Sequence, residues 1–166
     1  MYTVKGMLIP SCTKDGWIQG LQIRLDNNED DKYRWVSSGF ADGGTYCPGF
    51  IHTANWNGSK SAYLTEGIVK AQVASHLMGR QCVIGTSGAG HYAGLLELLE
   101  ELGITDLTEA LDMDKITNPN VMKALVNLNK LIMETNINYG HTEWNPVYNG
   151  LDDYLLLLDT EYTAVA

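Results

Sequence analysis

The sequence has 166 residues, of which 45% are hydrophobic and 19% charged, a composition typical of a folded globular protein rather than a disordered chain. Its formal net charge of −9 disfavours tight nucleic-acid binding by the chain alone, unless charge is segregated or metal ions intervene. No apolar stretch approaches the roughly 20 residues that span a bilayer, and the N-terminus lacks the features of a signal peptide, so we expect a cytoplasmic protein with no membrane partner.

Residues 1–57 are predicted to form a β-rich segment. Short runs with strand character occur at 5–10, 17–25 and 32–38. Asp15-Gly16 is typical of the tight turn between two antiparallel strands. A Gly- and Ser-rich irregular connection follows the third run.

Three basic residues of this segment, Arg24, Lys32 and Arg34, form a candidate basic stripe for nucleic-acid contact. Exposed charges that discourage edge-to-edge strand pairing explain the same residues equally well.

Residues 58–166 alternate strands with helices, which predicts an α/β fold with a parallel sheet of about four strands flanked by helices. The expected strands lie at 61–67, 81–85, 106–114 and 136–144. The expected helices lie at 68–79, 91–103, 118–135 and 151–158. This arrangement places ligands at the carboxyl ends of the strands, where loops lead into helices.

Acidic residues occur at three such positions: Glu66, the pair Asp112 and Asp114, and the pair Asp152 and Asp153. A strand period of two would put Asp112 and Asp114 on the same side. Oxygen ligands without His or Cys favour Mg²⁺ or Mn²⁺, and one or two such ions suit phosphoryl or nucleotidyl transfer. Helix capping and turn formation are the competing explanations for each residue alone.

Two further residues are candidates for phosphate contact. Lys70 lies on the helix after Glu66, and Ser87 lies in the Gly-rich turn "GTSGAGH". A solvated helix lysine and a plain strand-to-helix turn are the more common explanations of these two features.

The order "YLTEG … LDMD" resembles the two signature motifs of the Toprim domain, a Rossmann-like fold of DnaG-type primases, topoisomerases and some nucleases. "NGLDDYL" is similar to a later acidic motif of primase-type members. The sequence most resembles Toprim-like domains of unknown function in phage, plasmid and conjugative-element replication proteins. It departs from the primase pattern at Lys70 and Gln72, where an Asp is common nearby, and at Asn149, where a Lys is frequent.

The resemblance implies that Glu66 is a metal ligand or general acid/base, that Asp112 and Asp114 bind Mg²⁺, and that Asp152 or Asp153 assists. It also implies an enzyme of DNA replication, the catalytic domain of a mobile-element primase that makes primers on single-stranded DNA with two metal ions. Its partners would be the template and nucleotides, with a helicase or other replication domains. The alternatives are a Toprim-type nuclease and a non-catalytic module that binds nucleic acid or protein.

Overall fold

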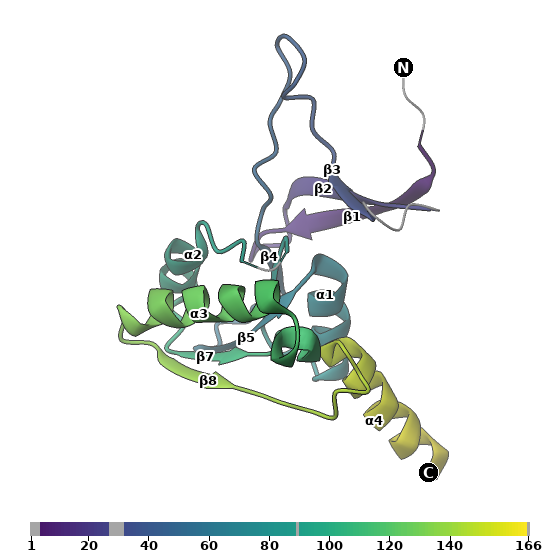
Figure 1. Ribbon diagram of the computed structural model, residues 1–166, viewed down its shortest axis with the longest axis vertical. Helices are drawn as coiled ribbons and strands as arrows, with labels where there is room; N and C mark the ends of the chain where they lie inside the picture. Colours follow the sequence, from purple (N-terminus) through teal and green to yellow (C-terminus); the bar gives the residue numbers. More distant parts are fainter. Residues whose placement is uncertain (1–3, 27–31, 89, 166) are drawn as a thin grey trace.

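The computed structural model describes residues 4–26, 32–88 and 90–165, the last five by their backbone alone. Three strands of the N-terminal segment form an antiparallel sheet in the order β1-β2-β3 (Figure 1): β1 (Gly6–Cys12), β2 (Ile18–Leu25) and β3 (Tyr33–Trp35). Gly16 in the first turn has a φ of 81°, which L-residues with a side chain rarely adopt. The β-rich N-terminal segment is thereby confirmed.

A second sheet of five strands has the order β4-β6-β5-β7-β8, and it is parallel except for β4, which pairs antiparallel with β6. Its strands are β4 (His52–Ala54), β5 (Ser61–Glu66), β6 (Val83–Thr86), β7 (Asp106–Glu109) and β8 (Asn138–His141). The sequence predicted about four strands because β4 is only three residues long and is buried throughout, so it shows no alternation. The division after residue 57 stays a prediction, and β4 lies on its N-terminal side.

The four expected helices are present: α1 (Ile68–Leu77), α2 (Leu95–Leu102), α3 (Pro119–Met133) and α4 (Leu151–Val165). Helix α2 begins later than the expected residue 91, and α4 continues beyond the expected residue 158. A short 3₁₀ helix, η1 (Met113–Ile116), precedes α3. Asn118 caps α3 by accepting a hydrogen bond from the backbone of Asn120, and Pro119 occupies the first turn. Gly103 ends α2 in the left-handed conformation, as expected for a C-terminal glycine cap.

The two faces of the five-stranded sheet have separate cores. Helices α2 and α3 cover one face, where Leu99 and Leu128 pack against Leu64 and Ile84. Helices α1 and α4 cover the other face. The small side chain of Ala71 on α1 belongs to the buried hydrophobic cluster of that face. The α/β class and the helix-covered parallel sheet are therefore confirmed.

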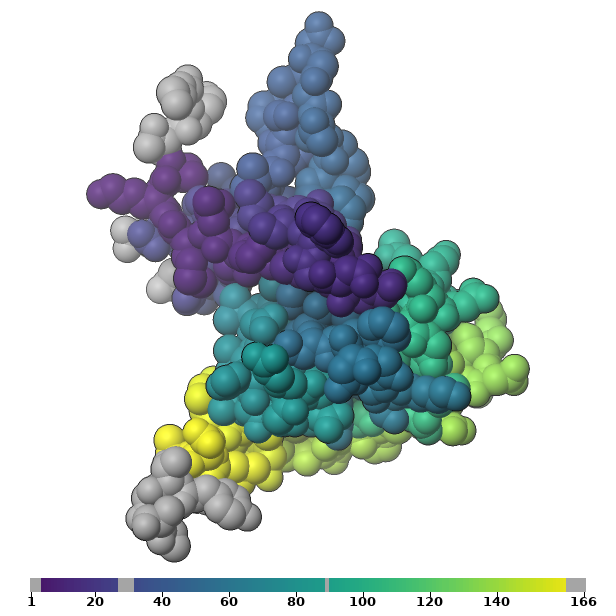
Figure 2. All heavy atoms as spheres, turned by 180° about the vertical axis from the view of Figure 1, so that it is seen from behind, coloured from purple at the N-terminus to yellow at the C-terminus, as the bar shows by residue number. Residues whose placement is uncertain are grey.

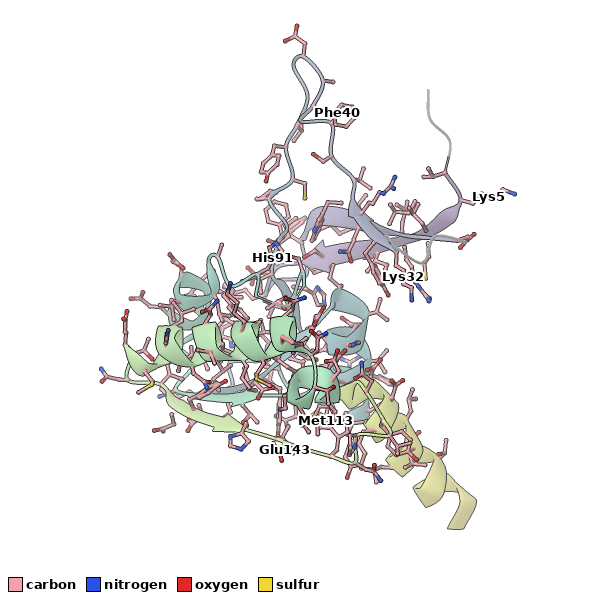
Figure 3. All side chains as sticks on the ribbon, in the orientation of Figure 1. Lys5, Lys32, Phe40, His91, Met113 and Glu143 are labelled. Carbon is pink, nitrogen blue, oxygen red and sulfur yellow. The ribbon has the colours of Figure 1, made fainter. Side chains whose placement is uncertain are left out.

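The N-terminal sheet packs against the edge of the second sheet beside β4 (Figures 1 and 2). His52 on β4 links the N-terminal sheet to α1. Its Nδ1 accepts a hydrogen bond from the Cys12 backbone at 3.0 Å, and its Nε2 lies 3.3 Å from Gln72 Oε1 on α1. The connection between β3 and β4 projects away from the body and carries the exposed ring of Phe40 (Figure 3). None of the helices in the described part of the chain has the length and apolar character to cross a membrane.

Candidate functional site

Strand β5 ends at Glu66, and the chain turns at once into α1. Gly67 makes this turn with a φ of 91°, and its backbone N–H donates to the Thr86 carbonyl on the neighbouring strand at 2.9 Å. Glu66 lines a hollow of about 140 Å³ together with Lys70 and Ser87. Two of the residues predicted to contact phosphate thus lie beside Glu66 at the carboxyl edge of the sheet.

The structure corrects the expected setting of Asp112 and Asp114. Strand β7 ends at Glu109, so neither aspartate lies on a strand, and Asp114 belongs to η1. The backbone leaves the sheet because Leu111 N–H donates to the Glu109 carboxylate at 2.5 Å and Met113 N–H donates to the Asn149 carbonyl at 2.9 Å. The turn into η1 therefore sets the orientation of the two aspartates, and the alternation of side chains along a strand does not.

Side chains from three other elements hold the two aspartates. The amide of Asn149 donates to Asp112 Oδ2 at 2.9 Å, and its Oδ1 accepts from the Asp114 backbone at 3.3 Å. Asn118 donates to Asp114 Oδ2 at 3.1 Å. The Lys70 ammonium forms a hydrogen-bonded ion pair with Asp112 Oδ2. Asn149 thus joins Asp112 to Asp114, and Lys70 joins Asp112 to the first turn of α1.

The pKa of Lys70 is shifted by its burial and by the carboxylates near it. Burial alone would lower its pKa, but the hydrogen bond to Asp112 and the nearby charges of Asp112, Asp152 and Glu66 raise the pKa above its ordinary value. The ammonium form is therefore the stable one at this site.

The two aspartates at the start of α4 have different surroundings. Asp152 is half-buried, and its pKa is raised by burial and by the adjacent Asp153, although Lys70 opposes the shift. Asp153 is exposed and lines a different hollow with Tyr148 and Leu156. Asp152 thus interacts with Lys70, whereas Asp153 lies at a different hollow.

A buried ion pair supports the turn that carries the aspartates. Glu109 is fully buried, and Lys115 of η1 donates to its two carboxylate oxygens at 3.2 and 3.1 Å and to the Thr142 carbonyl at 3.3 Å. The pair also lines a larger hollow of about 520 Å³, which contains none of the predicted site residues. We therefore place the candidate site at the smaller hollow, which Glu66 and Lys70 line, and at the Lys70–Asp112 ion pair beside it.

The donor set fits a divalent cation in its chemistry. One oxygen each of Asp112, Asp114 and Asp152 is buried and accepts no hydrogen bond, which is costly for a carboxylate unless a cation approaches it. Among the described side chains of residues 4–26, 32–88 and 90–160, however, no three from His, Cys, Asp or Glu come together closely enough to hold one ion. An ion here would rely on these free oxygens and on water.

The three residues of the predicted basic stripe do not share one face. Cross-strand pairing places Arg24 opposite Tyr33 and places Arg34 opposite Ile23, so the two arginines point to opposite sides of the sheet. Lys32 is exposed just before β3. The expectation of one continuous stripe is wrong, because strand alternation separates positions 24 and 34 in this register.

The sequence does not predict the contacts of Asn149 with both aspartates, although Asn149 lies within the motif "NGLDDYL". The sequence identifies Asn118 as a helix cap but gives no sign of its contact with Asp114, and Lys115 reads as an ordinary surface lysine. Asn149 and Asp114 are 35 positions apart in the sequence, and Lys70 and Asp112 are 42 positions apart, so only the folded chain shows these contacts.

The fold of the chain is similar to that of solved catalytic cores of DnaG primases. One similar structure, "Structure of the DnaG primase catalytic domain bound to ssDNA", has a TM-score of 0.66 at 12% sequence identity, covering 95% of this chain and 49% of that one. Another, "Structure of the DnaG catalytic core", has a TM-score of 0.57 at 13% identity, covering 95% of this chain and 50% of that one.

This chain thus spans about half the length of the two structures. Identities this low show a shared fold. No protein-family model and no curated protein sequence matches the chain.

Proposed function

We propose that this chain is a Toprim-type nucleotidyltransferase domain that makes primers on single-stranded DNA during replication of a mobile element. The observation that carries the proposal is the position of the carboxylates. Glu66 ends β5, and Asp112 and Asp114 follow β7, the parallel neighbour of β5. The likeness in fold to a primase catalytic domain bound to single-stranded DNA supports this choice among the Toprim activities.

In the proposed reaction the 3′-hydroxyl of the growing primer attacks the α-phosphate of an incoming nucleotide, and pyrophosphate leaves. Glu66 accepts the hydroxyl proton or orients the attacking group. Asp112 and Asp114, fixed by Asn149, would hold Mg²⁺ or Mn²⁺ through their free oxygens. Such a cation, when bound, stabilises the charge that develops on the phosphate.

The hollow beside Glu66 supplies contacts for the substrates. Gln22 and Tyr33 of the N-terminal sheet line it opposite Lys70 and Ser87. We propose that the template or nucleotide lies between the two sheets, with Arg24 on the same face as Tyr33. In this proposal the protein acts in the cytoplasm, with a helicase or other replication domains as partners.

The test is primer synthesis by the full chain on single-stranded DNA, with labelled nucleotides and Mg²⁺ or Mn²⁺. Glu66→Gln and Asp114→Asn should each lower synthesis by about 100-fold or more, because each removes a charge aimed at the reacting groups. Asp106→Asn is the matched control, since Asp106 is exposed at the opposite end of β7. It should leave synthesis unchanged.

Three results would contradict the proposal. Cleavage of the DNA without nucleotide incorporation would assign the same carboxylates to a nuclease. Synthesis that survives in Asp114→Asn would remove that residue from the site. If the chain binds DNA but catalyses neither synthesis nor cleavage, it is a non-catalytic binding module.

A further inference from the structure

Lys70 occupies a place where a positive charge is unexpected. It lies in the first turn of α1, where the helix dipole favours carboxylates and disfavours cations, and this turn contains no acidic residue. An ammonium there needs compensation from elsewhere in the fold. The compensation comes from Asp112, Asp152 and Glu66, which lie on three other elements or their ends.

The contacts around Lys70 form a built site. Asp112 is 8% exposed, and its Oδ2 accepts hydrogen bonds from both Lys70 and Asn149, while its Oδ1 is buried and accepts none. A Cβ on Gly150 would lie 2.3 Å from Asp152 Oδ1 and 3.4 Å from Lys70 Cε. The absence of a side chain at position 150 thus leaves room for Asp152 and Lys70 beside this residue.

From this geometry we infer that the Lys70 ammonium is a resident cation of the candidate site and takes the place of one of the two divalent ions expected there. The inference goes beyond the proposed function and rests on it only for the expectation of two ions. The carboxylates of Asp112, Asp152 and Glu66 against one ammonium leave a formal charge of −2. One divalent ion neutralises this charge, whereas a second would leave a formal charge of +2.

Mn²⁺ binding to the full chain tests the inference, with free Mn²⁺ measured by electron paramagnetic resonance. Lys70→Met removes the ammonium and keeps the length of the side chain. It should bind about one more Mn²⁺ per chain than the unaltered protein, because the Asp112 carboxylate then lacks its counter-ion. Its melting temperature should fall in chelator and rise on addition of Mn²⁺ by more than that of the unaltered protein.

Two control variants separate the specific effect from a change in net charge. Lys123→Met loses one positive charge from the exposed face of α3 and should bind as many ions as the unaltered protein. Lys70→Arg keeps the charge and should also gain no ion. If Lys70→Met fails to fold, Lys70→Gln replaces it, because its amide can still donate to Asp112.

The inference is overturned if Lys70→Met binds no more Mn²⁺ than the unaltered chain, or if Lys123→Met gains an ion as well. Its failure is distinct from failure of the proposed function. Primer synthesis by the unaltered chain without the gain of an ion would refute only the resident cation. The gain of an ion without any primer synthesis would refute only the function.

Discussion

Removal of Lys115 should destabilise the protein strongly, because this lysine neutralises the buried Glu109. Its ammonium donates to both Glu109 oxygens and to the Thr142 carbonyl, and its side chain is only 5% exposed. Lys115→Met leaves the Glu109 charge buried without its counter-ion. Loss of one partner of a buried ion pair costs about 3–5 kcal/mol. This cost is a large part of the free energy of unfolding of a typical domain, about 5–15 kcal/mol.

The double variant Glu109→Gln/Lys115→Met separates the charge from the packing. Gln at position 109 keeps an oxygen that can accept the Leu111 N–H, and no charge stays buried. The remaining cost is that of an unsatisfied amide group, about 1–3 kcal/mol. The double variant should therefore be more stable than Lys115→Met alone.

Urea unfolding followed by circular dichroism measures both variants against the unaltered chain and against Lys123→Met, an exposed lysine on α3. We expect Lys123→Met to change the free energy of unfolding by less than about 0.5 kcal/mol. A loss below about 1 kcal/mol in Lys115→Met, or a double variant no more stable than the single one, would refute the reasoning.

Two further predictions concern stability. Burial lowers the pKa of His52 despite its hydrogen bond to Gln72, so the folded form binds fewer protons than the unfolded one. The free energy of unfolding should therefore fall as the pH drops below about 6.5. His52→Asn, whose Oδ1 can still accept the hydrogen bond from Cys12, should lessen this pH dependence in urea titrations at several pH values. Gly85→Ala should lower the free energy of unfolding by about 1–3 kcal/mol, because its Cβ would lie 2.7 Å from a backbone carbonyl at the start of α1. Gly140→Ala, which has open space around the new Cβ, should leave the free energy of unfolding unchanged. Equal losses in the two variants would contradict the close packing of α1 on β6.

The sequence by itself determined most of the architecture. Alternating hydrophobic residues predicted β2, the capping pair Asn118-Pro119 predicted the start of α3, and Gly103 predicted the end of α2. These signals are local, since each depends on a few neighbouring side chains and on the backbone angles that they allow. The same reasoning missed β4, because three buried residues carry no period.

The candidate site was predicted only as a set of positions. Topology put Glu66, Asp112 and Asp114 at one edge of the sheet, since β5 and β7 are parallel neighbours. The tertiary structure decided how they meet: Asn149 joins the two aspartates, and Lys70 brings a cation into contact with Asp112. These contacts join residues distant in the sequence, and a lysine beside a carboxylate has no signature in the local sequence pattern.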